Sequence, residues 1–75
     1  MEAARHLRKR SFQLAGHRTS VALEPAFWAV LEDAARRRGL SLAALVTEID
    51  IARADTAHPL ASALRLHALT DAARR

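Results

Sequence analysis

The sequence contains no cysteine, only two glycines and two prolines, and no apolar run near the ~20 residues needed to cross a bilayer. The missing cysteines exclude disulfides and thiolate zinc sites. Two isolated glycines, Gly16 and Gly39, do not make a glycine-rich phosphate loop. The N-terminal stretch MEAARHLRKR has no apolar signal core, so we expect a cytoplasmic chain without a membrane segment.

The chain of 75 residues is long enough for one small domain. Such a chain buries a marginal core, and natural examples add disulfides, a metal or a second subunit. Its four histidines are separated by 11, 41 and 9 residues, which matches no compact ligand motif. Ser20 and Ser41 have no recognisable base beside them for catalysis. We therefore expect a non-enzymatic protein without metal or cofactor, stabilised by a second copy of itself.

The net charge of +4 is concentrated at the N-terminal end. Residues 1–18 hold five Lys or Arg against Glu2, whereas residues 19–75 hold seven arginines against seven acids. A basic arm of residues 1–9, followed by a domain of residues 10–75, suits a polyanion such as nucleic acid. The plainer alternative is a solvated tail in a chain enriched in arginine by GC-rich codons. The expected phosphate contacts near the arm are Arg8, Lys9 and Arg10.

The stretch HRTSVALEP, residues 17–25, predicts a β-strand from Arg18 to Glu24. Val21 and Leu23 alternate with polar residues, Thr19 and Val21 are β-branched, and a proline closes the run. The backbone N–H and C=O groups of a strand must be paired. No other strand of this quality follows residue 25, so the partner is either an upstream segment or a second copy.

The upstream candidate is RSFQL, residues 10–14. Its Phe12 and Leu14 occupy even positions and Val21 and Leu23 occupy odd ones, so on one straight strand they would face opposite sides. Gly16 permits a bulge or bend that resets the phase, but the segment AGH lacks a strong hairpin signature. Self-pairing of residues 18–24 around a two-fold axis is simpler. The outward positions of that ribbon would be Arg18, Ser20 and Ala22.

Three helices are predicted after the strand. The first runs from about Pro25 to Arg38, the second from its N-cap Ser41 to about Ala54, and the third from about Leu60 to Ala73. The predicted core stripe of the first helix is Phe27, Val30, Leu31 and Ala34, with Trp28 and Ala35 to one side. The third helix carries two apolar sides, one with Leu60, Leu64 and His67 and another with Leu66 and Leu69.

The order strand, helix, tight turn, helix in EPAFWAVLEDAARRRGLSLAALVTEI and the strand before it resembles the ribbon-helix-helix DNA-binding proteins. The segments RSFQLAGHRTSVALEPAFW, GLSLAALVTEID and HPLASALRLHAL look like a bacterial subfamily with a third helix, over about residues 10–69. The resemblance implies a homodimer whose two-stranded ribbon enters the major groove of double-stranded DNA. The expected dimer core is Val21, Leu23, Phe27, Leu31, Leu45, Val46 and Ile49.

By position, the resemblance implies that Arg18, Ser20 and Ala22 touch base edges. Arg18 has two donors for guanine, and Ser20 is an adaptable donor and acceptor. Ala22 departs from the family, where this position often carries a polar side chain, and offers a methyl contact to thymine. The family also anchors a phosphate at the start of its second helix, here at Ser41 and Leu42.

The expected fold is therefore mostly α, a ribbon-helix-helix with one N-terminal strand that pairs between two chains, followed by three helices. The expected function is sequence-specific binding of double-stranded DNA by a homodimeric bacterial transcriptional regulator. The alternative is a protein-interaction module on the same dimer fold, such as an antitoxin-type protein that binds a partner through its third helix.

Overall fold

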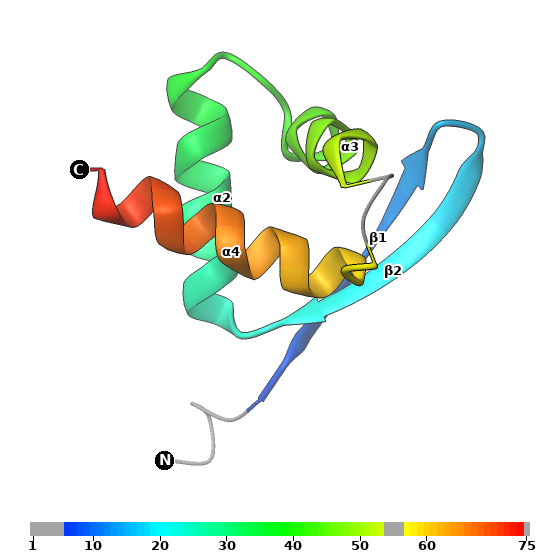
Figure 1. Ribbon diagram of the computed structural model, residues 1–75, viewed down its shortest axis with the longest axis horizontal. Coiled ribbons are helices and arrows are strands. Elements are labelled where there is room, and N and C mark those ends of the chain that lie inside the picture. Colours follow the sequence, from blue (N-terminus) through cyan, green and yellow to red (C-terminus); the bar gives the residue numbers. More distant parts are fainter. Residues whose placement is uncertain (1–5, 54–56, 75) are drawn as a thin grey trace.

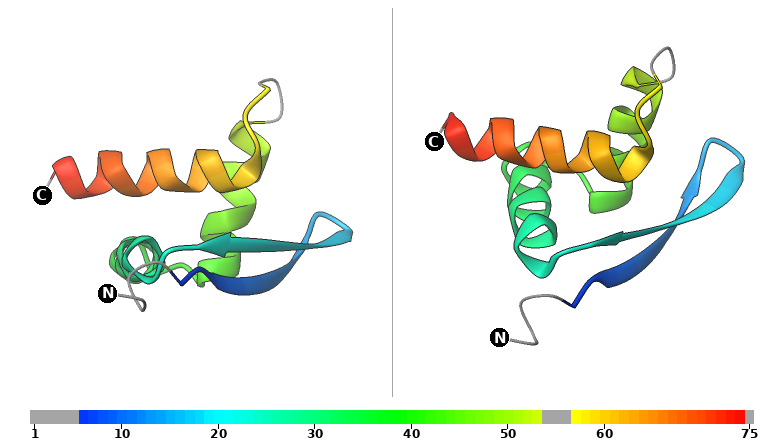
Figure 2. Two further views of the ribbon diagram at one scale, coloured as in Figure 1. Left: turned by 90° about the horizontal axis from the view of Figure 1, so that it is seen from below. Right: turned by 60° about the horizontal axis from the view of Figure 1, so that its bottom comes forward.

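The computed structural model describes residues 6–53 and 57–74, which form a hairpin followed by three helices (Figure 1). The elements in chain order are β1 (Arg8–Leu14), β2 (His17–Leu23), α2 (Pro25–Arg37), α3 (Leu42–Ala52) and α4 (Leu60–Ala73). The helices gather on one side of the hairpin, and the hairpin tip projects beyond them (Figures 1 and 2). No helix in the two described ranges has the length and apolarity that a bilayer crossing requires.

β1 and β2 pair antiparallel within the chain, in a register that joins Arg8 to Leu23 and Leu14 to His17. The two residues between the strands, Ala15 with φ 41° and Gly16 with φ 89°, both have positive φ. A two-residue turn with two positive φ angles is the type I′ turn, whose twist matches that of paired strands.

The predicted strand is confirmed, but in the structure its partner is a segment of the same chain. The preference for self-pairing over a hairpin is therefore corrected for the single chain. β1 also includes Arg8 and Lys9, so the predicted arm of residues 1–9 is in part a strand. Residues 1–5 of that arm lie outside the described residues.

The phases of the apolar residues explain why the hairpin forms. Each cross-strand pair joins an even-numbered residue to an odd-numbered one. Phe12 and Leu14 consequently share one face of the hairpin with Val21 and Leu23, and all four side chains are buried. On one straight strand, even-numbered and odd-numbered apolar residues would face opposite sides. A hairpin with a two-residue turn brings them to the same face.

The core lies between this inner face of the hairpin and the helices. Six of the seven residues expected in a dimer core are buried within the single chain, and Phe27 is half-buried. The buried side chains of α2 are Trp28, Leu31, Ala34 and Ala35. The predicted core stripe, which runs through Phe27 and Val30, is therefore displaced around the axis of α2. The side of the helix that includes Trp28 faces the core.

This displacement arises because Trp28 packs against β1. The Trp28 and Phe12 ring centroids lie 5.9 Å apart. The Trp28 Nε1–H also donates a 2.8 Å hydrogen bond to the carbonyl oxygen of Arg8, which satisfies the polar atom of a 2 % exposed indole. One side chain thus fastens β1 to α2.

The later helices begin as predicted. Ser41 caps α3, because its Oγ accepts the Ala44 N–H at 3.0 Å. The predicted end at Ala54 lies outside the described residues. α4 buries Leu64 and Ala68 against α2 and α3. Its second apolar side is uncovered, with Leu66 52 % and Leu69 57 % exposed.

Candidate nucleic-acid interface

The outer face of the hairpin is a polar surface opposite the buried one. Arg18 and Ser20 are exposed and Ala22 is half-buried, so the three β2 positions predicted to face outward do so. The register places a β1 residue across from each of them, and all three of these β1 residues are exposed. The pairs are Gln13 with Arg18, Ser11 with Ser20, and Lys9 with Ala22.

Sequence reasoning missed Ser11 and Gln13 as surface positions beside the predicted readers. The signal was present in RSFQL, where polar and apolar residues alternate as they do in the later strand. Without a hairpin register, that alternation did not show which face Ser11 and Gln13 would share. The Ser11 and Ser20 Oγ atoms lie 2.9 Å apart, so a hydrogen bond joins an outward side chain of β1 to one of β2.

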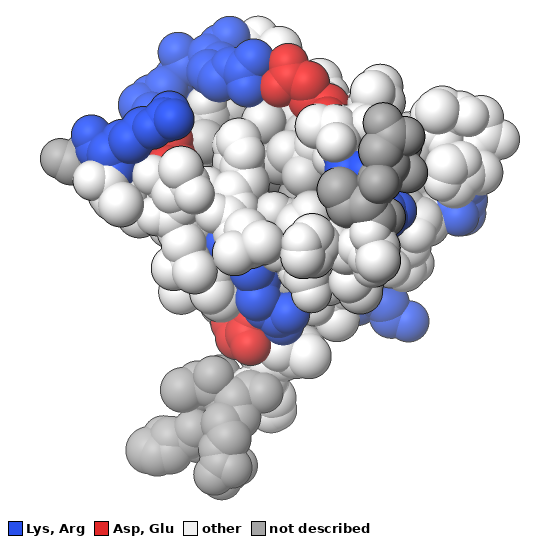
Figure 3. Space-filling model, viewed as in Figure 1, with Lys and Arg blue, Asp and Glu red and all other residues white. Residues whose placement is uncertain are grey.

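The hairpin and the helices differ in their balance of positive and negative charge. Residues 8–23 contain Arg8, Lys9, Arg10 and Arg18 and no acid. Every carboxylate of the described residues from 24 onward lies within 4 Å of an arginine: Glu24 with Arg65, Glu32 with Arg10, Asp33 with Arg36 and Arg37, Glu48 with Arg38, Asp50 with Arg53, and Asp71 with Arg37. On the face seen in Figure 3, red lies beside blue over the helices, whereas the blue at the hairpin side has no red next to it.

The ion pairs hold the helix carboxylates in their charged form. A hydrogen bond from its own backbone N–H and one from Arg65 lower the pKa of Glu24. The guanidinium of Arg38, which donates to both carboxylate oxygens, lowers the pKa of Glu48. Asp33 and Asp71 in turn raise the pKa of Arg37. The arginines of α2 and the turn after it are therefore engaged with acids, and the hairpin carries the excess positive charge.

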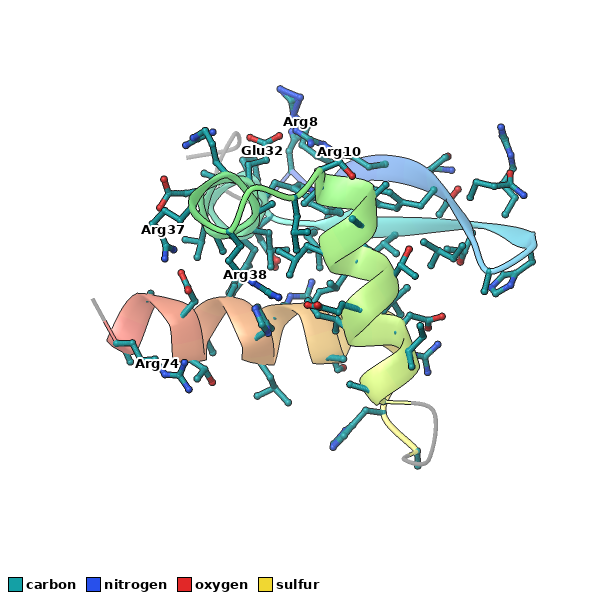
Figure 4. All side chains as sticks on the ribbon, turned by 90° about the horizontal axis from the view of Figure 1, so that it is seen from above. Arg8, Arg10, Glu32, Arg37, Arg38 and Arg74 are labelled. Carbon is teal, nitrogen blue, oxygen red and sulfur yellow. The ribbon has the colours of Figure 1, made fainter. Side chains whose placement is uncertain are left out.

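The three cations predicted to contact phosphates are split by the fold. Lys9 lies on the outer face, whereas Arg8 and Arg10 alternate with it on the other side of β1. Arg10 forms an ion pair with Glu32 and its guanidinium lies 5.1 Å from the centroid of the Trp28 ring (Figure 4). Arg10 is thus used in fastening β1 to α2. Arg8 is exposed beside that pair.

The N-terminus of α3, where a phosphate contact was predicted, has free donor capacity. Ser41 is exposed and Leu42 half-buried. The Ser41 oxygens take up the N–H groups of Ala44 and Leu45. The first two amides of the helix, those of Leu42 and Ala43, belong to the donors that no helix satisfies internally. They are suited to an anion.

No group of three or more metal-ligating side chains occurs in the part of the chain that the structure describes. A groove of about 370 Å³ lies between α3 and α4, and Ile49, Leu66 and His67 are among its lining residues. Most of the exposed area of its walls is apolar.

The fold defines the class of this protein as a two-stranded antiparallel ribbon followed by helices. A family model described as "Ribbon-helix-helix domain" matches residues 7–72, and the chain belongs to that family. Its members are generally DNA-binding transcription regulators and typically not enzymes. Searches of curated proteins and of solved structures returned no match.

Proposed function

We propose that this protein is a homodimeric regulator of bacterial transcription that binds specific double-stranded DNA in the cytoplasm. The outer face of the β1–β2 hairpin is the surface that reads the major groove. The observation that carries this proposal is the separation of the hairpin into a buried apolar face and an exposed polar one that bears cations and no acid.

The dimensions of the hairpin support groove entry. Seven residues at about 3.3 Å each make strands of roughly 20 Å, and the two strands lie about 4.8 Å apart. The major groove is about 12 Å wide and admits such a ribbon. Arg18 offers two donors to guanine, Ser20 offers a short hydroxyl, and Ala22 offers a methyl group to thymine. The amides of Leu42 and Ala43 would hold a phosphate.

The proposed dimer pairs the outer edge of β2 with that of a second copy. Within the described residues the sheet has two strands, so this edge has no ladder partner there. In a two-residue hairpin the outward-facing residues of β2 direct their backbone groups to that edge. Antiparallel pairing centred on Ser20 would place Arg18 opposite Ala22 of the other copy.

In that dimer the sheet has four strands and spans about 14 Å between its outer strands, at roughly 4.8 Å per step. This exceeds the groove width of about 12 Å. The two β2 strands would therefore lie deepest, and the β1 strands would lie toward the groove walls, from which their outward side chains can reach either a phosphate or the edge of a base. Lys9, on the outer face of β1, is placed for such a phosphate contact.

A titration against duplex DNA tests the function. Wild type, Arg18→Ala and Arg18→Lys are measured on a selected operator and on a scrambled duplex. We expect Arg18→Ala to weaken the free energy of binding to the operator by about 1 to 3 kcal/mol per half-site, and that of binding to scrambled DNA by much less. Arg18→Lys should also lose discrimination, because lysine cannot form the two-donor contact.

Arg74→Ala is the matched control, because it removes an exposed cation at the end of α4. It should leave the ratio of operator to scrambled affinity unchanged. Affinity of wild type should also fall steeply as salt rises. An equal ratio for wild type and both Arg18 variants would show that Arg18 reads no base.

Dimerisation has its own test. The melting temperature of an obligate dimer rises with protein concentration. A folded monomer in analytical ultracentrifugation at micromolar concentration would refute the dimer without refuting DNA binding by the hairpin.

The exposed Leu66 and Leu69 favour a second candidate, a protein-interaction module such as an antitoxin-type partner binder. The groove between α3 and α4 lies beside Leu66. If wild type binds no duplex even at low salt, this candidate replaces the first.

A further inference from the structure

The hairpin register makes the outer face two residues wide within each chain. Starting from the pair next to the turn, cross-strand pairs in an antiparallel ladder alternate between hydrogen-bonded and non-hydrogen-bonded. The pair flanking a two-residue turn is hydrogen-bonded, so the three outward pairs are of the other kind, whose Cα atoms lie about 4.5 Å apart and whose side chains are closest. Each residue expected to read DNA from β2 therefore has an immediate neighbour from β1.

The neighbour of Arg18 is Gln13. Both side chains are exposed, and neither forms a hydrogen bond or ion pair with another described residue. Arg10 and the helix arginines from Arg36 to Arg38 are by contrast held by acids. The Gln13 amide carries one acceptor and one donor group, which match N6 and N7 of adenine, whereas the guanidinium matches O6 and N7 of guanine.

The neighbour of Ser20 is Ser11, and their hydroxyls are joined at 2.9 Å. A hydroxyl has one proton, so the serine that donates within the pair can present only acceptor lone pairs to a base, while its partner keeps a proton to donate outward. Either hydroxyl can be the donor, so the hydrogen-bonding roles that Ser11 and Ser20 present to a base are coupled to each other.

We propose that β1 contributes to base recognition: Gln13 reads a base next to the one that Arg18 reads, and Ser11 positions the hydroxyl of Ser20. This inference rests on the proposed DNA-binding function and adds determinants from a strand outside the positions that the family resemblance implies. Side chains of one cross-strand pair lie within about 5.5 Å of each other. Base pairs stack about 3.4 Å apart. One pair of residues therefore spans the two bases of one base pair or two neighbouring base pairs.

The test is a selection of binding sites from a randomised duplex, carried out in parallel with wild type, Gln13→Ala, Arg18→Ala and Thr70→Ala. Thr70 is exposed on α4 and serves as the control for a change away from the hairpin. We expect Gln13→Ala to relax the base preference at one position per half-site, the same as or adjacent to the position that Arg18→Ala relaxes. Its affinity for the wild-type site should fall about 5- to 100-fold, as expected for one bidentate base contact.

Ser11 is tested by a double-mutant cycle with Ser20. Ser11→Ala and Ser20→Ala should relax the same position, and the double variant should lose little more than the larger single loss, because the two hydroxyls act as one unit. Ser11→Thr, which keeps the hydroxyl, should restore the preference. Additive losses at two different positions would overturn the positioning role.

The inference and the function fail in different ways. If Arg18→Ala relaxes a position while Gln13→Ala leaves every base preference unchanged, β1 does not read bases and the proposed function stands. If wild type enriches no sequence and binds no duplex at low salt, the function itself is wrong. Circular dichroism confirms that each variant is folded, which is expected because these side chains lie outside the core.

Discussion

The turn between the strands offers a direct test of the hairpin. Ala15 holds φ 41°, in the left-handed region that costs an L-residue with a Cβ roughly 1 to 2 kcal/mol. Asparagine tolerates this conformation, and Asn-Gly is the preferred sequence of a type I′ turn. Ala15→Asn should therefore stabilise the fold by about 0.5 to 1 kcal/mol, a part of the left-handed penalty. For a domain of this size the melting temperature would rise by about 2 to 8 °C.

Gly16→Ala is the opposite perturbation at the neighbouring residue. Gly16 holds φ 89°, and an added Cβ would meet no atom within 4 Å, so the cost is one of backbone conformation and not of a clash. A penalty of roughly 1 to 2 kcal/mol, partly offset by about 0.4 to 1 kcal/mol from a stiffer unfolded chain, leaves a net loss of about 1 kcal/mol. The melting temperature should fall by about 4 to 8 °C.

Both variants are measured by thermal unfolding in far-ultraviolet circular dichroism at one fixed protein concentration, because a dimer melts at a concentration-dependent temperature. Ala57→Asn is the control, since Ala57 is exposed and its φ is not positive. It should change the melting temperature little. If Gly16→Ala does not destabilise and Ala15→Asn does not stabilise the protein, the strands do not meet through this turn. Pairing between chains alone would then be the better description.

Three further predictions concern the core and the ion pairs. Trp28→Phe should lower the free energy of unfolding by about 1 to 3 kcal/mol, because it removes the N–H donor to the Arg8 carbonyl and leaves unfilled space. Unfolding in guanidinium chloride measures this loss. An unchanged midpoint would show that the indole does not hold β1 against α2. Leu64→Ala should cost about 2 to 5 kcal/mol in the same assay, since Leu64 is 0 % exposed, and a loss well below that range would mean that α4 is not part of the core. The lowered pKa of Glu24 means that its stabilising contribution is present above about pH 4.5 and is lost as the pH falls through the folded value. The melting temperature of Glu24→Gln should therefore fall less than that of wild type between about pH 5 and pH 3, and parallel curves would contradict the lowered pKa of Glu24.

The helices could be predicted from local signals in the sequence. Pro25 at the first turn, Gly39 beyond the end and Ser41 as a cap are features whose effect does not depend on distant residues. They predict the starts of α2 and α3 at the observed residues, and Pro59 does the same for α4. The single strand Arg18–Glu24 was also located to within a residue at each end.

β1 and the buried side of α2 could not be settled in this way, because both depend on pairing between segments. The parity of Phe12 and Val21 carries opposite meanings for one straight strand and for a hairpin, and the sequence AGH lacks the asparagine that would mark the turn. Once β1 is placed, Trp28 must face inward to pack against Phe12. The same omission hid Gln13 as a neighbour of Arg18.

The pairing of helix carboxylates with arginines makes the charge distribution of the molecule lopsided. Its positive pole lies at the hairpin, while the arginines of α2 are balanced locally by acids on the helices. In the field of a polyanion such a distribution experiences a torque that turns the hairpin toward the approaching surface before any contact forms. The benefit appears in kinetics, because encounters that begin in the wrong orientation can be corrected during approach and the association rate rises. Adding an unpaired lysine to the exposed side of α4 would weaken that alignment, even though the total positive charge would increase.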